Sequence, residues 1–440
     1  MSSPATSETS DVSNNYAWYI VAVLLLASIV AYLDRLVMGF LVDPIKNDLG
    51  FSDTQMGMLN GLAFTVFYVL MGIPLGRLVD VKNRKIVVSV CIIIWSCMTA
   101  FCGLARNFTM LFIARAGVGI GEAGLNPGAM SIISDLFSKE RVAKPIAVYT
   151  LSFYIGGGLA IILGGQLIEY FNSLGSISLA GFKDISSWRL VFFCTGLPGL
   201  IVAALMLLTV REPERKQSLA ARHKEEAPSL TEVMAFIKIN AKLYTLMFGS
   251  FIAFGFYLYA VLGWYPAMLM RTYGIGPGQV ALSYGFVYLI AGTSGALAAG
   301  PIINRISNHG RVEAPIIVCV TGMCILILPA VASPLMPNLF LCLACFAIMK
   351  FCWGMIMTAS FTSILIVTPG RMQGVMIASY LVLLNITGGS LGAILVGVLS
   401  DNWFGADNVR YSVALVAAVW LPVSAVLFMM LKPVYRNTLT

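Results

Sequence analysis

The sequence predicts an all-α membrane protein with twelve transmembrane helices, arranged as two pseudo-symmetric halves of six helices each. Three observations lead to this prediction: the composition, the number of long apolar runs, and short motifs that recur in both halves. Of the 440 residues, 59% are hydrophobic and only 11% are charged, whereas soluble domains carry roughly 25% charged residues. This much apolar surface cannot be hidden in a soluble core, so we expect lipid around the protein.

The second observation is the number of apolar runs that are long enough to cross a bilayer, which takes about 20 helical residues. Glycine, proline and charged residues separate twelve such runs. The predicted spans are 16–41, 56–80, 85–105, 108–135, 143–171, 188–210, 242–270, 279–304, 312–333, 337–367, 372–401 and 409–432.

These spans divide the chain into two halves, 16–210 and 242–432, joined by a polar linker at 211–241 that contains a short amphipathic stretch. Residues 1–15 are expected to form a disordered tail without the features of a secretory signal, and 433–440 a second tail. Most of the 28 lysines and arginines fall in loops on the side of the termini, which predicts that both termini are cytoplasmic. The same loops explain the net charge of +8 without a nucleic-acid partner.

The third observation is that matching residues recur in the two halves. Arg115 precedes Gly119 by four positions in the fourth span, as Lys350 precedes Gly354 in the tenth. In the fifth and eleventh spans a tyrosine, Tyr149 or Tyr380, stands eight positions before a Gly-Gly pair. Such repeats are typical of transporters whose halves rock about a site between them.

Five charged residues lie inside the predicted spans: Asp34, Arg35, Arg115, Glu122 and Lys350. A charge at the centre of a bilayer costs at least ~2.5–3.5 kcal/mol, so such side chains face a cavity or a partner. Arg115 and Glu122 share a helical face but are about 10 Å apart along the axis, so another helix must bridge them. Asp34 of the first span is the candidate bridge.

These charges predict proton coupling, with Asp34 and Glu122 taking up and releasing protons while Arg115 exchanges between them. The alternative is a buried ion pair that only fixes helix packing. Arg35 points about 100° away from Asp34 and is expected to pair elsewhere. Lys350 is alone in its half, and binding of an anionic head group and a structural role stay equally open.

Aromatic and amide side chains on the fifth, seventh and eleventh spans suit a cavity for an acyl chain with a polar head, although each could equally serve packing. The predicted substrate-binding residues are Arg35, Tyr149, Phe153, Trp264, Lys350, Tyr380 and Asn385.

A charged loop between the second and third spans predicts a cytoplasmic gate. Gly76 allows close helix approach, and Asp80 could pair with Arg84 or with a neighbouring helix end, in a contact that breaks when the halves rock. The alternative is that these charges only set the topology. The predicted gate residues are Gly76, Asp80, Arg84 and Lys85.

This loop resembles the signature of the major facilitator superfamily, Gly-x-x-x-Asp-(Arg/Lys)-x-Gly-Arg-(Arg/Lys). The four gate residues match it, whereas Val81 and Asn83 depart from it. The resemblance implies the major facilitator fold over nearly the whole chain. In the fifth span Ala160 and Ile161 replace the glycine and proline of the superfamily's antiporter motif, which gives little support for antiport.

Within that superfamily the chain is similar to the spinster family. The resemblance lies in Tyr32-Leu33-Asp34-Arg35, in Arg115-x-x-x-Gly119-x-x-Glu122 and in Trp264-Tyr265-Pro266, while Ala31 stands where the family often has Asn. Spinster proteins are proton-driven carriers of amphiphilic lipids, including lysophospholipids and sphingosine-1-phosphate. The resemblance implies the same activity here, with Asp34 and Glu122 as protonation sites and Arg115 as their switching partner.

The expected function is therefore a proton-coupled carrier of an amphiphile. A small organic anion or drug, clamped by Arg115 and Lys350, is the alternative cargo, and a non-transporting receptor a third reading. An enzyme is disfavoured because both histidines, His223 and His309, lie in loops, and no ATP-binding motif occurs. We expect a monomer in a bacterial inner (plasma) membrane, with no cofactor or metal and with protons as the coupling ion.

Overall fold

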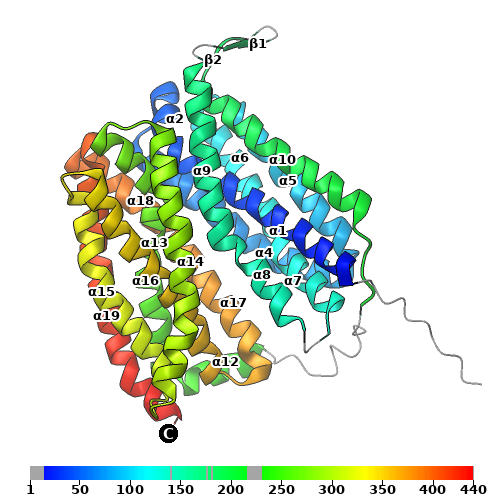
Figure 1. The fold of residues 1–440 in the computed structure, drawn as a ribbon, viewed down its shortest axis with the longest axis vertical. Coiled ribbons are helices and arrows are strands. Elements are labelled where there is room, and N and C mark those ends of the chain that lie inside the picture. Colours follow the sequence, from blue (N-terminus) through cyan, green and yellow to red (C-terminus); the bar gives the residue numbers. More distant parts are fainter. Residues whose placement is uncertain (1–13, 139–140, 175–176, 180–181, 216–229, 440) are drawn as a thin grey trace, which may run out of the picture.

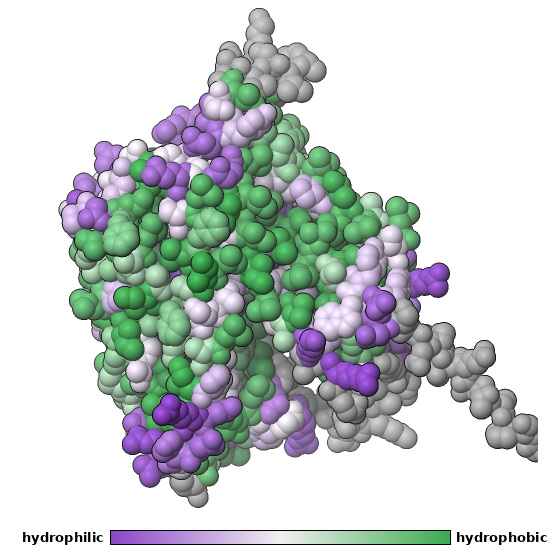
Figure 2. All heavy atoms as spheres, in the orientation of Figure 1, coloured by the Kyte–Doolittle hydropathy of each residue, from purple (hydrophilic) through white to green (hydrophobic). Residues whose placement is uncertain are grey.

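The structure, a computed structural model, describes residues 14–138, 141–174, 177–179, 182–215 and 230–439. Within these ranges it contains 12 helical spans that are long and apolar enough to cross a membrane, which confirms the expected number. Hydrophobic side chains cover the middle of the molecule and hydrophilic ones gather toward its ends (Figure 2). This is the distribution expected when a bilayer surrounds the middle.

The first half holds six spans, three of which are interrupted. Breaks at Gly61, at Ala123-Gly124 and at Leu151 divide the second, fourth and fifth spans. The elements are α1 (Asn14–Leu36), η1 (Val37–Phe40), α2 (Val42–Leu49), α3 (Asp53–Asn60), α4 (Leu62–Val81), α5 (Arg84–Gly103), α6 (Phe108–Glu122), α7 (Leu125–Leu136), α8 (Ala143–Thr150), α9 (Ser152–Ser173), β1 (Ile177–Leu179), β2 (Phe182–Ile185) and α10 (Ser187–Thr209).

The second half repeats this plan with longer helices. Its eleventh span contains two π-helical turns, η4 and η5, which are wider than an α-helical turn and frequently occur at functional sites. The elements are α12 (Leu230–Ile239), α13 (Ala241–Tyr273), α14 (Pro277–Ser307), α15 (Ala314–Ala332), η2 (Ser333–Leu335), α16 (Leu339–Val367), η3 (Gly370–Met372), α17 (Gln373–Leu383), η4 (Leu384–Gly389), α18 (Ser390–Leu399), η5 (Ser400–Phe404), η6 (Ala406–Asn408) and α19 (Val409–Leu439).

The observed spans end within a few residues of the predicted ones, except at the C-terminus. There α19 continues through most of the predicted tail to Leu439, and the Tyr435 hydroxyl donates to the Ser363 carbonyl oxygen at 3.1 Å. The amphipathic stretch of the linker is α12. Residues 1–13 of the predicted N-terminal tail and 216–229 of the linker lie outside the described residues.

An even number of crossings returns the chain to the side where it began, so α1 begins and α19 ends at the same end of the molecule. We call this end the terminal face and the opposite end the far face. The two halves stand side by side and diverge toward the terminal face (Figure 1).

The halves are closely packed on the far-face side. There α9 packs against α14, α3 against α18, and η1 against α13. A Cβ atom at Gly57 would lie 2.6 Å from the Ala393 carbonyl oxygen, and one at Gly158 would lie 2.7 Å from Leu289 Cβ. No side chain fits between the helices at these two positions, which closes the far face.

The same helices separate toward the terminal face. A Cβ atom at Gly72 or Gly76 of α4, or at Gly374 of α17, would meet no other atom within 4 Å. Leu70 and Ile73, on the same stretch of α4, are 59% and 64% exposed. The space between the halves therefore opens to the terminal face.

Candidate functional site

A cavity lies between the halves, and together with the solvent at its opening it encloses about 770 Å³ of empty space. Its first wall comes from α1, η1, α3, α4, α6 and α9, and its second from α13, α14, η4 and α18. The lining combines two arginines with amide, hydroxyl and aromatic side chains. The lining residues are Tyr32, Arg35, Leu36, Gly39, Asn60, Phe64, Thr65, Arg115, Phe153, Tyr259, Leu262, Gly263, Tyr288, Asn385, Gly389 and Ala393.

The charged pair at this cavity is Arg35 and Glu122. Arg35 Nε donates to Glu122 Oε2 at 2.5 Å. The Arg35 side chain is 26% exposed, whereas that of Glu122 is completely buried. Glu122 is the last residue of α6, where the fourth span breaks, and its other carboxylate oxygen accepts no hydrogen bond from the described residues. The arginine therefore separates the carboxylate from the cavity.

Three aromatic rings surround the Arg35 guanidinium. Its central carbon lies 4.6 Å from the ring centroid of Phe64, 4.8 Å from that of Tyr68 and 5.6 Å from that of Tyr32. Contacts of this length between a cation and an aromatic face are attractive. The rings therefore hold the guanidinium at the cavity wall independently of Glu122.

Asp34, next to Arg35 in α1, is completely buried and does not line the cavity. Neither of its carboxylate oxygens accepts a hydrogen bond within the described part of the chain, with the Thr99 and Thr195 hydroxyls nearby but outside hydrogen-bonding geometry. Arg115 Nη1 donates instead to the Asp34 main-chain oxygen, at 3.3 Å. The structure thus brings the predicted cluster together, but Glu122 pairs with Arg35 and not with Arg115.

The predicted substrate-binding residues occupy two kinds of position. The cavity is lined by Arg35, Phe153 and Asn385. The other four lie behind its wall in this conformation and are 0–2% exposed: Tyr149, Trp264, Lys350 and Tyr380.

Two of these predicted residues engage in hydrogen bonds that sequence reasoning missed. The Tyr149 hydroxyl donates to Asn126 Oδ1 at 2.7 Å, and Asn126 Nδ2 donates to the Tyr68 hydroxyl at 3.1 Å. In the other half the Tyr259 hydroxyl donates to Asn385 Oδ1 at 2.5 Å. The first chain of bonds braces one of the rings that face Arg35.

Among the predicted gate residues, Asp80, Arg84 and Lys85 form hydrogen bonds and ion pairs that join the first half to the start of the linker. Arg84 forms ion pairs with Asp135 of α7 and with Glu212, the latter at 2.7 Å. The Lys85 amide also donates to Glu212, at 2.8 Å. The Asp80 carbonyl oxygen accepts from Arg215. These bonds fasten α4, α5 and α7 to the start of the linker, and the gate between the halves stays a prediction for another conformation.

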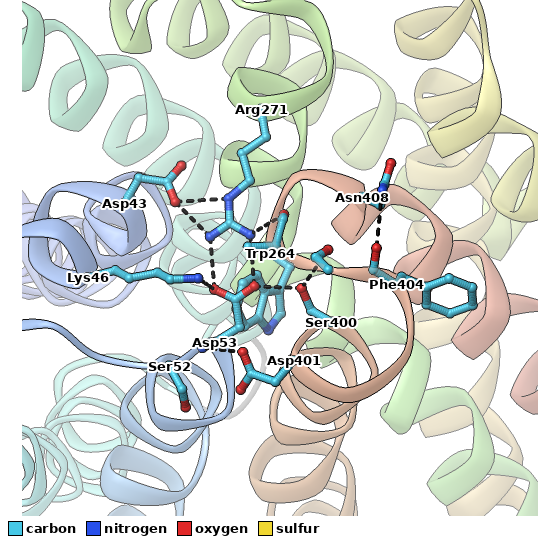
Figure 3. Close-up of polar contacts among 12 residues, drawn as sticks. Asp43, Lys46, Ser52, Asp53, Trp264, Arg271, Ser400, Asp401, Phe404 and Asn408 are labelled. Carbon is cyan, nitrogen blue, oxygen red and sulfur yellow. Dashed lines mark hydrogen bonds and ion pairs between the residues drawn. The ribbon is translucent and has the colours of Figure 1, made fainter.

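On the far face an ionic network joins the halves (Figure 3). Arg271, near the end of α13, donates to Asp43 Oδ1 at 2.6 Å and to Asp53 Oδ2 and Oδ1 at 2.9 and 3.0 Å. Asp53 also accepts from Lys46 Nζ at 2.7 Å and from the Ser400 hydroxyl at 2.6 Å. The fully buried Asp53 carboxylate thus has partners from both halves.

A second carboxylate, Asp401, belongs to the second half and binds the first half. Asp401 of η5 accepts from the Asp53 and Thr54 main-chain amides at 3.0 and 2.7 Å, which caps the N-terminus of α3. Trp264 lies under this network, donates to the Ala393 carbonyl oxygen at 2.8 Å and faces Arg271. We call Asp43, Lys46, Asp53, Arg271, Ser400 and Asp401 the far-face network.

Comparisons with known proteins agree with this geometry. A family model described as Major Facilitator Superfamily matches residues 24–393. An "MFS-type efflux pump" of Mycolicibacterium smegmatis is 28% identical over 450 residues and covers 99% of this chain and 98% of its own. "Protein spinster" of Drosophila melanogaster is 24% identical over 313 residues, which are 70% of this chain and 49% of that protein.

Solved structures show the same similarity over almost the whole chain. A bacterial homologue of the human lysosomal transporter spinster, in an inward-facing and unoccupied conformation, superposes with a TM-score of 0.84 at 26% identity. The match covers 97% of this chain and 99% of that one.

Proposed function

Because the chain belongs to the major facilitator superfamily, it is a membrane transporter and not an enzyme, and we propose that it carries an amphiphilic, lysolipid- or sphingolipid-like substrate by proton-coupled alternating access. The observation that carries the proposal is the Arg35–Glu122 ion pair at the wall of the cavity between the halves, beside the unpaired Asp34 carboxyl. A buried carboxylate that depends on one cation changes the local charge balance when it takes up a proton.

The proposed cycle begins from the conformation described above, in which the cavity opens to the terminal face. We assign this face to the cytoplasm of a bacterial inner membrane, because the basic loops lie there. Rocking of the halves separates the far-face network, closes the terminal face and opens the cavity to the outside. There a proton from outside neutralises Glu122 and removes the partner of Arg35, and the guanidinium then remains held by Phe64 and Tyr68. Protonation of Asp34 allows this carboxyl to stay buried without a counter-charge. The return movement re-forms the far-face network, opens the terminal face and exposes both carboxyls to the higher pH of the cytoplasm, where they lose their protons.

The cargo is inferred from the composition of the cavity wall. Leu36, Phe64, Phe153 and Leu262 offer apolar surface for an acyl chain. Arg35 and Arg115 and the amides of Asn60 and Asn385 offer donors for a polar head. An amphiphile would satisfy both kinds of surface at once.

A small organic anion or a drug is the second candidate cargo. Two guanidinium groups, Arg35 and Arg115, line the cavity, and a carboxylate can accept hydrogen bonds from both. The similar mycobacterial protein is named an efflux pump, which is compatible with a drug as cargo.

Proton movement in proteoliposomes with a pH-sensitive dye inside tests the proposal. Lysophospholipids, sphingoid phosphates, sugars and organic anions are added in turn to vesicles with the native protein, D34N, E122Q or D407N. Asp407 is an exposed carboxylate outside the cavity and serves as the matched control. We expect an amphiphile to trigger flux in the native protein and in D407N, and D34N and E122Q to lose the coupling. Normal coupling in both cavity variants would overturn the proton assignment, and flux with organic anions alone would favour the second cargo.

A further inference from the structure

Lys350 of α16 is a buried cation that the proposed proton cycle does not use. It is 1% exposed, and its Nζ lies 3.4 Å from the ring centroid of Tyr288 and 4.0 Å from that of Trp353. Throughout the described ranges it forms neither an ion pair nor a hydrogen bond with an acceptor. Two aromatic faces replace only part of the hydration that an ammonium loses on burial.

Two further donors in the same aromatic cluster lack acceptors. The Trp353 indole Nε1 and the Tyr257 hydroxyl are buried and have no hydrogen-bond partner among the described residues. The Tyr257 and Trp353 rings meet edge to face, with centroids 5.9 Å apart. An indole N–H and an ammonium can only donate. Apart from the Tyr257 hydroxyl oxygen, which can also accept, the side chains of this cluster on α13 and α16 offer donors, and the cluster contains no anionic acceptor.

The cluster lies next to the cavity, where α14 packs against α9. A Cβ atom at Gly292 would lie 2.9 Å from Tyr154 of the first half and 3.9 Å from Lys350 Cε. Tyr288 has one ring face against the ammonium and is itself part of the cavity lining. A turn of the Tyr288 side chain would thus connect the ammonium with the bound cargo.

The repeat-related position in the first half differs from Lys350 in its counter-charge. Arg115 corresponds to Lys350 and also faces an aromatic ring, that of Phe64, at 5.7 Å. Its half supplies two carboxylates, Glu122 on the same helix as Arg115 and Asp34 on α1. The acidic residues of 242–432 are Glu313, Asp401 and Asp407, and all three lie at or beyond helix ends.

We propose that Lys350, Trp353 and Tyr257 form a subsite for an anionic group of the cargo, a carboxylate or a phosphate that accepts hydrogen bonds from all three. The anion supplies the counter-charge that the second half lacks. This inference rests on the proposed function in one respect, that the cavity binds the cargo.

Binding to the purified protein in nanodiscs tests the subsite, with empty nanodiscs as the partition control. Three probes are used: oleoyl lysophosphatidate, monooleoylglycerol with the same chain but no phosphate, and glycerol 3-phosphate without the chain. The variants are K350M, K350R, Y257F and W353F, and K238M replaces an exposed lysine of α12 as the matched control.

We expect the native protein and K238M to prefer lysophosphatidate over monooleoylglycerol. K350M should lose at least about tenfold in lysophosphatidate affinity and much less in monooleoylglycerol affinity, because a charge-assisted hydrogen bond is removed. K350R should keep most of the preference. Y257F keeps the same ring without its hydroxyl, and W353F keeps an aromatic ring without the indole N–H. Each should narrow the preference for lysophosphatidate by about threefold, and both keep the test valid even where K350M does not fold.

The results separate the two proposals. Equal affinity of the native protein for both amphiphiles would overturn the subsite and leave the carrier function intact. The same holds if K350M keeps the full preference for lysophosphatidate, or if Y257F and W353F both keep it. Binding of neither amphiphile would overturn the proposed cargo. Glycerol 3-phosphate binding that depends on Lys350 would support the subsite with a small soluble anion as the ligand.

Discussion

Arg271 and Asp53 form a two-point ion pair across the boundary between the halves, with Nη1 2.9 Å from Oδ2 and Nη2 3.0 Å from Oδ1. The Asp53 side chain is fully buried and that of Arg271 is 9% exposed. A paired geometry of this kind is stronger and more directional than a single contact between charges. The pair belongs to the conformation in which the far face is closed, so it stabilises that conformation relative to one with an open far face.

We expect R271Q to shift the population toward the open far face by about tenfold or more, because removing one partner of a buried pair strands the other. Lys46 and Ser400 remain on Asp53 and limit the effect. Hydrogen exchange should become faster in the peptide 50–60 on the far face and slower around 76–90 on the terminal face. R271K keeps the charge and should shift both peptides less. Uniformly faster exchange would indicate general destabilisation and contradict this role.

Asp401 should contribute separately, as a cap on α3 that comes from the other half. Loss of an N-terminal cap costs about 1 kcal/mol, so D401A should accelerate amide exchange at Asp53 and Thr54 roughly fivefold. If both contacts hold the same boundary, D401A combined with R271Q should deviate from the sum of the single effects by at least ~0.5 kcal/mol. Strict additivity would show that the cap acts only on its helix.

The Arg35–Glu122 pair predicts a pH response of the first half. A protonated Glu122 resembles the amide of E122Q, so the native protein in acid should behave as E122Q does at every pH. We expect hydrogen exchange in 62–72, which carries the rings facing Arg35, to differ between the two proteins while Glu122 is ionised. The difference should disappear as acid protonates Glu122 in the native protein, after correction for intrinsic rates. D407N, which removes an exposed carboxylate, is the control and should keep the native pH response. An E122Q protein that retains the full native pH response would contradict the assignment.

The predicted gate can be tested at Gly76, where an added Cβ atom would meet no other atom within 4 Å in this conformation. G76L should leave stability unchanged or raise it by up to about 1 kcal/mol, because glycine is a poor helix residue. Transport should nevertheless slow strongly, since the added side chain occupies the space into which the halves must close. Thermal unfolding and liposome flux measured on the same preparation separate the two effects. G249A, in α13 and away from the cavity, is the matched glycine substitution. Native flux in G76L would exclude closure at this site.

The spans were predictable because each is long and apolar, and the charged cluster because charges inside apolar runs need partners. The pairing within the cluster was not. Helical spacing relates Arg115 to Glu122 within one span, but it does not give the rotation of α1 that brings Arg35 to Glu122. The break after Glu122 has a signal in Gly124 and Pro127, but these residues do not indicate that the fourth span breaks beside the carboxylate.

The far-face network was not predictable for a different reason. Asp43 and Asp53 are more than 200 positions from Arg271 in the chain. Each stands near the end of a span, where charged residues are common and usually face water. Only the docking of the two halves shows that these charges meet, and a single sequence carries no record of that docking.

The placement of both cavity carboxyls in the first half has an electrical consequence. In the proposed cycle Asp34 and Glu122 can carry at most two protons, while the cargo brings its own charge. A monoanion moving with one proton transfers no net charge, and with two it transfers one positive charge. Each unbalanced charge couples to the membrane potential by about 2.3 kcal/mol per 100 mV. The voltage sensitivity of the flux therefore reports how many of the two carboxyls take part.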